Sequence, residues 1–247
     1  MNSRRFAAPL IQSVAIVAAL TAFSGCRSLN GAPSLDLSAD GIVGAPVLAN
    51  KDGQTLAYNF RAVEPGVLYR ASDFNRTRPG TTAEGQPLSF EDGQLFDALR
   101  ALNIHHVVSL APMPDYYAEE GYFQFWTKRS GYAITTSPIA VGDDDVYGTD
   151  DRSGVHAAGE LLSIMKHRKP ADGAVLIHGE AGKGAIGVMA AAYELARTTG
   201  RGDDAAAWAN VVRRYLASNQ LADGSPAVTA DLLERIRPQL MFVSGLF

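Results

Sequence analysis

The residues best suited to chemistry lie together between positions 174 and 187. Ala174 to Ile177 form a short apolar run with β-branched members, which predicts a buried strand. A glycine-rich turn follows, and from Ala185 the composition favours a helix. Such a turn directs backbone N–H groups and the positive end of the helix dipole toward one point, where a phosphate-like anion is stabilised. We call residues 179–185 the cradle, and the expected anion-binding residues are Glu180, Ala181, Gly182, Lys183, Gly184 and Ala185.

Two common phosphate-binding motifs do not fit the cradle. The P-loop pattern G-x-x-x-x-G-K-[ST] fails because Gly184 follows Lys183 and no glycine lies five positions before Gly182. Gly182-x-Gly184-x-x-Gly187 matches the dinucleotide-binding pattern, but that fold needs a second strand with an acidic end about 20 residues further on. The residues after Gly187 favour a helix instead, which argues against a dinucleotide site.

The segment resembles the signature of cysteine-dependent protein phosphatases of the tyrosine and dual-specificity kind, His-Cys-x-x-Gly-x-x-Arg-[Ser/Thr]-Gly after a buried strand. His178, Gly182 and Gly187 match the family's His and two Gly positions. Three positions depart from the signature: Gly179 stands for the nucleophilic Cys, Ala185 for the phosphate-binding Arg and Ile186 for the hydroxyl residue.

The departures remove the family's chemistry. Its mechanism needs a thiolate that attacks phosphorus and an Arg that binds the phosphoryl oxygens through paired hydrogen bonds. Because Gly179 and Ala185 supply neither group, the resemblance implies a catalytically inactive pseudophosphatase that binds a protein or an anionic or phosphorylated ligand. One alternative is an active phosphoric monoester hydrolase in which His178, Glu180 or an Asp acts on water. The other is a structural scaffold with a vestigial cradle.

An acidic segment, Gly142 to Asp151, precedes the helix that leads to the cradle strand. In active relatives a general-acid Asp lies on a loop at this place in the chain, so the resemblance implies that Asp143 or Asp144 occupies that position. A solvated acidic loop is the alternative, because a site without a nucleophile has no leaving group to protonate. The spacing is not that of an EF-hand calcium loop, and no Glu closes it.

Residues 1–26 resemble a bacterial lipoprotein signal peptide. Two arginines precede an apolar stretch, residues 10–23, that is too short for a comfortable membrane span. Phe23-Ser24-Gly25-Cys26 then resembles a lipobox, whose Cys is lipidated after cleavage. This implies a membrane anchor through Cys26, and because Arg27 is not the Asp associated with inner-membrane retention, we expect the outer membrane, facing the periplasm. An ordinary secretory signal is the alternative.

Composition limits the partners of the chain. Its 247 residues are 47% hydrophobic with a net charge of −4, which suits one globular domain and provides no basic surface for nucleic acid. The single cysteine, Cys26, lies outside the signature. His105 and His106 are neighbours on a predicted strand, where they face opposite ways and cannot together chelate a metal. We therefore expect no metal and no cofactor.

The segment before the first helix has two parts. Residues 27–55 are rich in small and polar residues and are expected to form a flexible tether, with a phosphatase-like domain over residues 56–247. Tyr58 to Ser72 predicts a strand, a Pro65-Gly66 turn and another strand, and it also resembles the start of bacterial members of the phosphatase family. Arg70 could approach the active-site mouth there, although we favour an ordinary solvated or salt-bridged Arg.

Strands and helices then alternate along the chain. We expect a helix from Ser89, with Asp92 completing a capping-box-like pair, and an aromatic-rich helix over residues 115–129 that packs on the sheet. The remaining elements are expected at residues 104–110, 132–139, 154–168, 174–177, 185–197, 203–217 and 227–240. This alternation predicts an α/β fold with a central, mostly parallel sheet flanked by helices on both faces. The resemblance implies that it is like that of the tyrosine and dual-specificity phosphatases.

Overall fold

The structure is a computed structural model in which the described residues are 47–50, 52–53, 55–74, 92–111, 113–140, 154–179, 182, 184–199, 205–213 and 230–246. All of them belong to the unit Pro33–Phe247, and the unit Met1–Ala32 lies outside the described residues. Among the described residues, no helix combines the length and the apolar character needed to cross a membrane.

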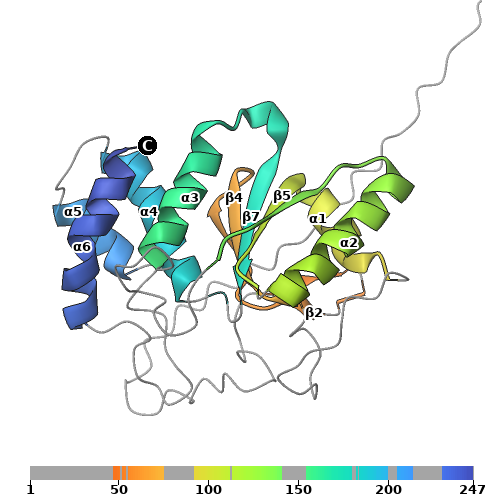
Figure 1. Ribbon diagram of the computed structural model, residues 1–247, viewed down its shortest axis with the longest axis horizontal. Helices are drawn as coiled ribbons and strands as arrows, with labels where there is room; N and C mark the ends of the chain where they lie inside the picture. The colour runs from red at the N-terminus through yellow and green to blue at the C-terminus, as the bar shows by residue number, and fades with distance from the viewer. Residues whose placement is uncertain are drawn as a thin grey trace, which may run out of the picture. The chain divides into compact units, whose positions relative to one another are not determined.

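The strand that leads to the cradle is the middle strand of the main sheet. β7 (Ala174–Gly179) pairs in parallel with β4 (Leu68–Ser72) on one side and with β5 (Ile104–Ser109) on the other. β6 (Thr135–Pro138) continues the parallel side, and β3 (Arg61–Glu64) adds an antiparallel edge, so the order is β3-β4-β7-β5-β6 (Figure 1). The predicted α/β fold with a mostly parallel central sheet is confirmed.

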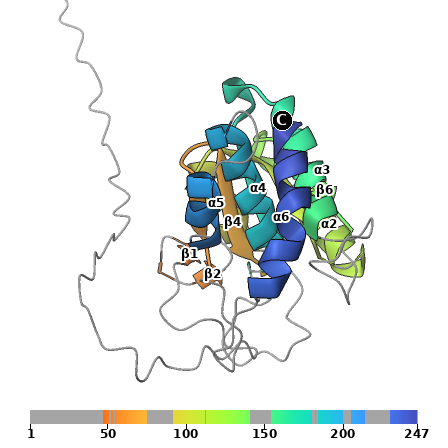
Figure 2. The same ribbon diagram turned by 90° about the vertical axis from the view of Figure 1, so that its left-hand side faces the viewer.

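Helices cover both faces of this sheet. α1 (Gln94–Ala101) and α2 (Met113–Ser130) lie on one face (Figure 1). α3 (Gly154–Lys166), α4 (Ala185–Thr199) and α6 (Ala230–Gly245) lie on the other, with α5 (Ala205–Val211) beside α4 (Figures 1 and 2). A short 3-10 helix, Pro170–Asp172, connects α3 to β7. The chain passes from the carboxyl end of β7 at Gly179 through the cradle to the start of α4 at Ala185.

Alternate residues of β7 supply two separate hydrophobic cores. Val175 and Ile177 pack with the α3, α4 and α6 layer, whereas Ala174 and Leu176 pack with residues of α1 and α2. Side chains alternate across a strand, and burying each Val, Leu or Ile contributes about 1.5–3 kcal/mol, so this strand is strongly fixed in register. All six residues of β7 are buried, which makes it a rigid base for the cradle.

Several boundaries differ from the sequence predictions, among them the end of α6, which lies at Gly245 rather than at residue 240. α1 begins at Gln94 rather than Ser89, and its N-cap residue is Gly93, which makes no side-chain cap hydrogen bond. Asp92, one residue earlier, accepts a hydrogen bond from the Gln94 N–H at 2.9 Å, and Ser89 itself lies outside the described residues. β1 (Leu48–Ala49) pairs with β2 (Thr55–Ala57), so ordered structure is present before residue 56. The strand expected over residues 132–139 is limited to β6.

The aromatic residues of α2 do not all pack on the sheet. Tyr116, Tyr122 and Phe123 are buried as expected, but Tyr117 is 59% exposed and Phe125 is 39% exposed. These two side chains lie outside the inward stripe of the helix, because the stripe follows a spacing of three to four residues. α2 therefore has an apolar face toward the sheet and scattered aromatics toward solvent.

Candidate functional site

The cradle begins where the middle strand ends. The Gly182 N–H donates a hydrogen bond to the Gly179 carbonyl at 2.8 Å, which turns the chain sharply after β7. Gly182 and Gly184 have φ angles of +63° and +51°, a region that favours glycine. α4 then begins at Ala185, and the Val188 N–H donates to the Gly184 carbonyl at 3.0 Å. The described cradle residues thus form the strand, turn and helix that the sequence predicts.

Apolar side chains lie close to Gly179 at the end of β7. A Cβ atom on Gly179 would lie 3.1 Å from the Leu110 Cβ and 3.5 Å from the Ile186 Cγ1. Ala185 and Ile186, at the start of α4, are both buried.

His178 points away from the cradle turn and into the α1 and α2 side of the sheet. Its side chain is fully buried, and its Nε2 lies 3.1 Å from the Oε2 of Glu119, which is also fully buried on α2. The Phe74 ring packs against the imidazole, with ring centroids 4.2 Å apart. Asp73, just after β4, lies in the same cluster. His178 therefore belongs to a buried polar cluster behind the cradle.

Two opposing effects act on the imidazole of His178. Burial alone would lower its pKa, because burial disfavours the charged form. The close approach of Glu119 and the negative charge of Asp73 act in the other direction, and the net result is a pKa raised above the ordinary value. The cluster thus favours positive charge at His178.

Sequence reasoning missed Glu119, although a signal was present. Glu119 lies three residues after Tyr116, three before Tyr122 and four before Phe123, and all three aromatic side chains are buried. Residues with this spacing share one face of a helix, so an acidic residue on that face must be buried. A buried carboxylate needs a partner, and His178 is the one that the fold supplies.

Arg70 is not a solvated surface residue, so only the salt-bridged form of the interpretation favoured above is still open. It is 2% exposed and lies on β4, directly beside Ile177 of β7. Alternation along the strand puts its side chain on the same face as Leu68, which packs with the α3, α4 and α6 layer. Arg70 and His178 therefore flank the central strands on opposite faces.

Several predicted site residues lie outside the described residues. They are the lipidation site Cys26, the acidic-loop residues Asp143 and Asp144, and the cradle residues Glu180, Ala181 and Lys183. Their roles remain predictions. His105 and His106 are described and have separate partners, because His105 contacts the Ala133 carbonyl at 2.9 Å and His106 contacts the Thr135 hydroxyl at 2.7 Å.

Known structures share the general arrangement of this chain. No protein-family model and no curated sequence matches it. It is similar to PTPMT1 in complex with PI(5)P (11% identity, 76% of this chain and 97% of that chain covered, TM-score 0.44). It is also similar to DUSP15 (20%, 75% and 86%, TM-score 0.40) and to TpbA of P. aeruginosa (16%, 81% and 97%, TM-score 0.42). The similarity to tyrosine and dual-specificity phosphatases is thus structural and of low sequence identity.

Proposed function

We propose that this protein is a lipid-anchored component of the bacterial cell envelope with a catalytically inactive, phosphatase-like domain. The cradle of that domain binds a protein or an anionic or phosphorylated ligand. The observation that carries the proposal is the surroundings of Gly179, where the nucleophile is absent and the Leu110 and Ile186 side chains approach its place to within 3.1 and 3.5 Å.

These surroundings support inactivity more strongly than the missing cysteine alone. A thiol between two apolar side chains would be desolvated, and burial in apolar surroundings raises the pKa of a thiol and leaves it unreactive. Ala185 and Ile186 replace the two other polar residues of the signature and are both buried. Three neighbouring positions have therefore changed together toward apolar packing.

Ligand binding is supported by the backbone conformation of the cradle and by its lysine. Gly182 and Gly184 hold the backbone in positive-φ conformations, and α4 starts immediately after them, so its first N–H groups have no carbonyl partner within the helix. Lys183 adds a positive charge to the segment. A lysine is a point charge that cannot reproduce the paired hydrogen bonds of Arg, so we expect weak affinity for a simple phosphate.

The alternative of an active hydrolase is less well supported. A residue that activates water must reach the substrate, and His178 is fully buried on the far side of β7 with Glu119 as its neighbour. If His178 cannot act, the base that activates water would have to be Glu180 or a residue of the acidic segment Gly142 to Asp151. Both lie outside the described residues.

The catalytic part of the proposal is tested with the full chain in detergent and an aryl phosphate substrate. We expect no hydrolysis above background. A triple variant, Gly179→Cys with Ala185→Arg and Ile186→Ser, restores the three signature groups, and the serine also removes the contact between Ile186 and the new side chain. Activity in this variant alone supports an inactive phosphatase frame. Activity of the unmodified chain that co-purifies with it through successive columns would overturn the proposal.

The anchor is tested separately in a bacterial host. We expect a fatty-acid probe to label the unmodified chain and the chain to fractionate with the outer membrane. Cys26→Ser removes the acceptor thiol, so its chain should lose the label and leave the membrane fraction. Equal membrane association of both chains would contradict the lipid anchor without affecting the conclusion about catalysis.

A further inference from the structure

Three potential metal ligands converge behind the cradle. Asp73, Glu119 and His178 each offer one ligand atom, and these atoms all lie within 4.8 Å of one another. The three residues come from separate elements, because Asp73 follows β4, Glu119 belongs to α2 and His178 belongs to β7. Their convergence is therefore a product of the fold and not of sequence proximity.

Two buried polar atoms of this cluster, Glu119 Oε1 and His178 Nδ1, have no hydrogen-bond partner among the described residues. The other two, Glu119 Oε2 and His178 Nε2, are 3.1 Å apart and pair with each other by charge and by a hydrogen bond. Buried polar atoms are almost always satisfied in native proteins, so this cluster calls for an additional partner.

The distances suit a metal ion as that partner. Oxygen and nitrogen ligands bind first-row divalent ions at about 2.0–2.2 Å, so two ligand atoms of one ion lie about 3 Å apart. The Glu119–His178 separation of 3.1 Å matches that spacing. Asp73, at the edge of the cluster, could complete the set after a small shift or through a bound water.

The charge of the three side chains and the access to them from solvent also suit a divalent metal ion. A bound metal ion would displace the proton that the cluster favours on His178, and the neutral imidazole with two carboxylates would then carry a charge of −2, which a divalent cation balances. Asp73 retains slight exposure at 7%, whereas Glu119 and His178 have none, so an ion would arrive from the side of Asp73. One imidazole with two carboxylates is a ligand set that Zn²⁺ accepts, and Mn²⁺ accepts oxygen-rich sets.

We propose that Asp73, Glu119 and His178 form a structural site for a divalent first-row metal ion, with Zn²⁺ as the best match. The ion would tie α2 to β4 and β7 directly behind the cradle. This goes against the expectation from sequence, which considered His105 with His106 and the acidic segment Gly142 to Asp151 as metal ligands and expected no metal. The metal site does not depend on catalysis or on what the cradle binds. A negative result for the metal site would therefore leave the proposed function unaffected, and the reverse is also true.

The experiment uses the full chain in detergent, stripped with a chelator and then titrated with Zn²⁺. We expect one tightly bound ion per chain by elemental analysis, a higher melting temperature with Zn²⁺, and loss of that increase on chelation. Glu119→Gln and His178→Gln should each weaken binding by at least about 100-fold, because each removes a direct ligand. Circular dichroism establishes whether the variants remain folded.

Two control variants match the ligands in type. Glu120→Gln removes the neighbouring carboxylate, which is outside the cluster, and His167→Gln removes an exposed imidazole. Both should bind Zn²⁺ like the unmodified chain. If a ligand variant does not fold, Co²⁺ loaded into the unmodified chain decides the question, since a nitrogen- and oxygen-ligated ion gives visible absorption bands. No tight ion in the unmodified chain, or binding unaffected by Glu119→Gln, would mean that the cluster is an imidazolium–carboxylate pair only and would overturn the proposal.

Discussion

Gly182 of the cradle lies against the backbone of Ala71 in β4. A Cβ atom on Gly182 would come within 2.6 Å of the Ala71 carbonyl carbon and 2.7 Å of its oxygen. Because backbone atoms cannot move aside as a flexible side chain can, this contact admits only glycine. The φ angle of +63° at Gly182 also favours glycine, independently of this contact. The close approach joins the cradle to the sheet.

The first prediction is that Gly182→Ala strongly destabilises the fold. We expect the free energy of unfolding to fall by at least about 3 kcal/mol, since both backbone strain and overpacking act at this position. Urea unfolding followed by circular dichroism measures the change. A decrease in the free energy of unfolding below about 1 kcal/mol, the cost expected from the φ angle alone, would show that the Ala71 backbone shifts at little cost and would contradict the prediction.

Two other glycines serve as controls for that prediction. Gly131→Ala tests the φ angle alone, because Gly131 has a φ of +72° and open space around its Cβ position. Gly159→Ala should instead stabilise α3 by about 0.5–1 kcal/mol, since Gly159 has no nearby atoms to collide with and alanine is the better helix former.

The second prediction concerns acid stability through His106. Burial, with a smaller effect from Arg168, lowers the pKa of His106 from 6.5 to about 4. Above pH 6.5 the ring is neutral in both the folded and unfolded states, so it adds no pH dependence. As the pH falls from 6.5 toward 4, the unfolded chain takes up a proton that the folded chain does not, and stability is lost.

We expect His106 to account for a loss on the order of 2 kcal/mol across that window, an amount reduced by the partial exposure of the ring. The comparison is of urea unfolding at pH 7 and pH 4.5 for the unmodified chain and His106→Gln, whose pH dependence should be smaller. His105→Gln is the control, because that ring is hydrogen-bonded at the Ala133 carbonyl instead. Identical pH dependence in the unmodified chain and His106→Gln would contradict the assignment.

The third prediction ranks two contacts of Glu64, which tie α4 to β3. The Tyr193 hydroxyl donates a hydrogen bond to the Glu64 Oε2 at 2.6 Å, and Arg197 Nη1 lies 2.8 Å from the same oxygen. Burial and the nearby Glu64 raise the pKa of Tyr193, so its hydroxyl stays protonated as a donor. The Arg197 side chain is 47% exposed, which screens its ion pair.

Tyr193→Phe should therefore cost about 1.5–2 kcal/mol, because a hydrogen bond to a charged group is lost. Arg197→Gln should cost less than about 1 kcal/mol. In a Glu64→Gln background the effect of Tyr193→Phe should shrink, and thermal or urea unfolding of the four chains measures the coupling. A larger loss from Arg197→Gln than from Tyr193→Phe would reverse the ranking.

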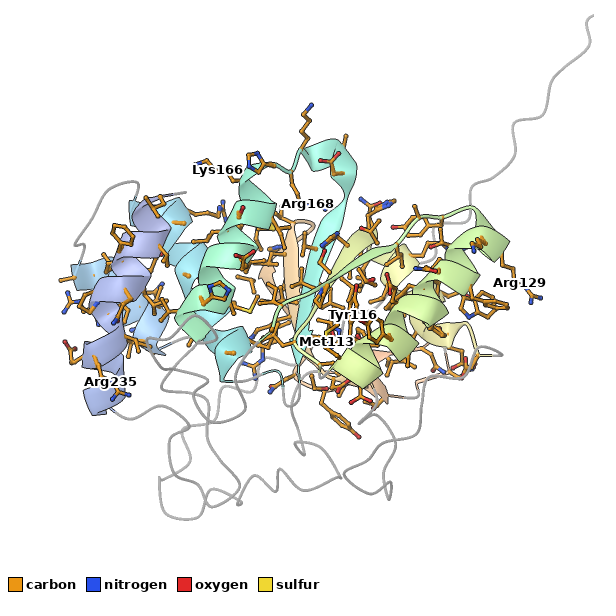
Figure 3. The ribbon with its side chains drawn as sticks, in the orientation of Figure 1. Met113, Tyr116, Arg129, Lys166, Arg168 and Arg235 are labelled. Atoms are coloured by element: carbon orange, nitrogen blue, oxygen red, sulfur yellow. The ribbon has the colours of Figure 1, made fainter. Side chains whose placement is uncertain are left out.

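The fourth prediction separates a binding cradle from a vestigial one. Lys183→Glu reverses the charge of the segment, so we expect affinity for inorganic phosphate to fall at least about tenfold, equivalent to 1.4 kcal/mol. Lys169→Glu is the matched control, since Lys169 precedes the opposite end of β7, near Lys166 and Arg168 (Figure 3). Isothermal titration calorimetry gives both affinities. Unchanged phosphate binding in Lys183→Glu would favour the scaffold interpretation.

Local patterns were sufficient to predict most elements that position the site. The predicted strand and helix on either side of the cradle correspond to β7 and α4, and the helix predicted over residues 154–168 corresponds to α3. These predictions succeed because periodicity reflects which face of an element the core covers. The start of α1 could not be placed in the same way, because the polar residues before it suggested a cap at Ser89, whereas the N-cap is Gly93, which offers no side-chain signal.

The buried cluster behind the cradle could not be predicted from local patterns. Glu119 and His178 are brought together by the packing of α2 on the sheet. The sequence around each residue does not indicate that the other is its partner. Asp73 adds a third element to the same point. Arg70 was misjudged for a related reason, because a charged residue in a strand is usually solvated and only the neighbouring β7 shows that this one is buried.

The central position of β7 also dictates the order in which this chain can fold. β4 and β5 both pair with β7 and not with each other, so the two halves of the sheet stay apart until residues 174–179 insert between them. Pairing residue 68 with residue 175 requires closure of a long loop, which slows folding. A nascent or truncated chain that stops before residue 174 would expose two unpaired strand edges and would be prone to aggregate.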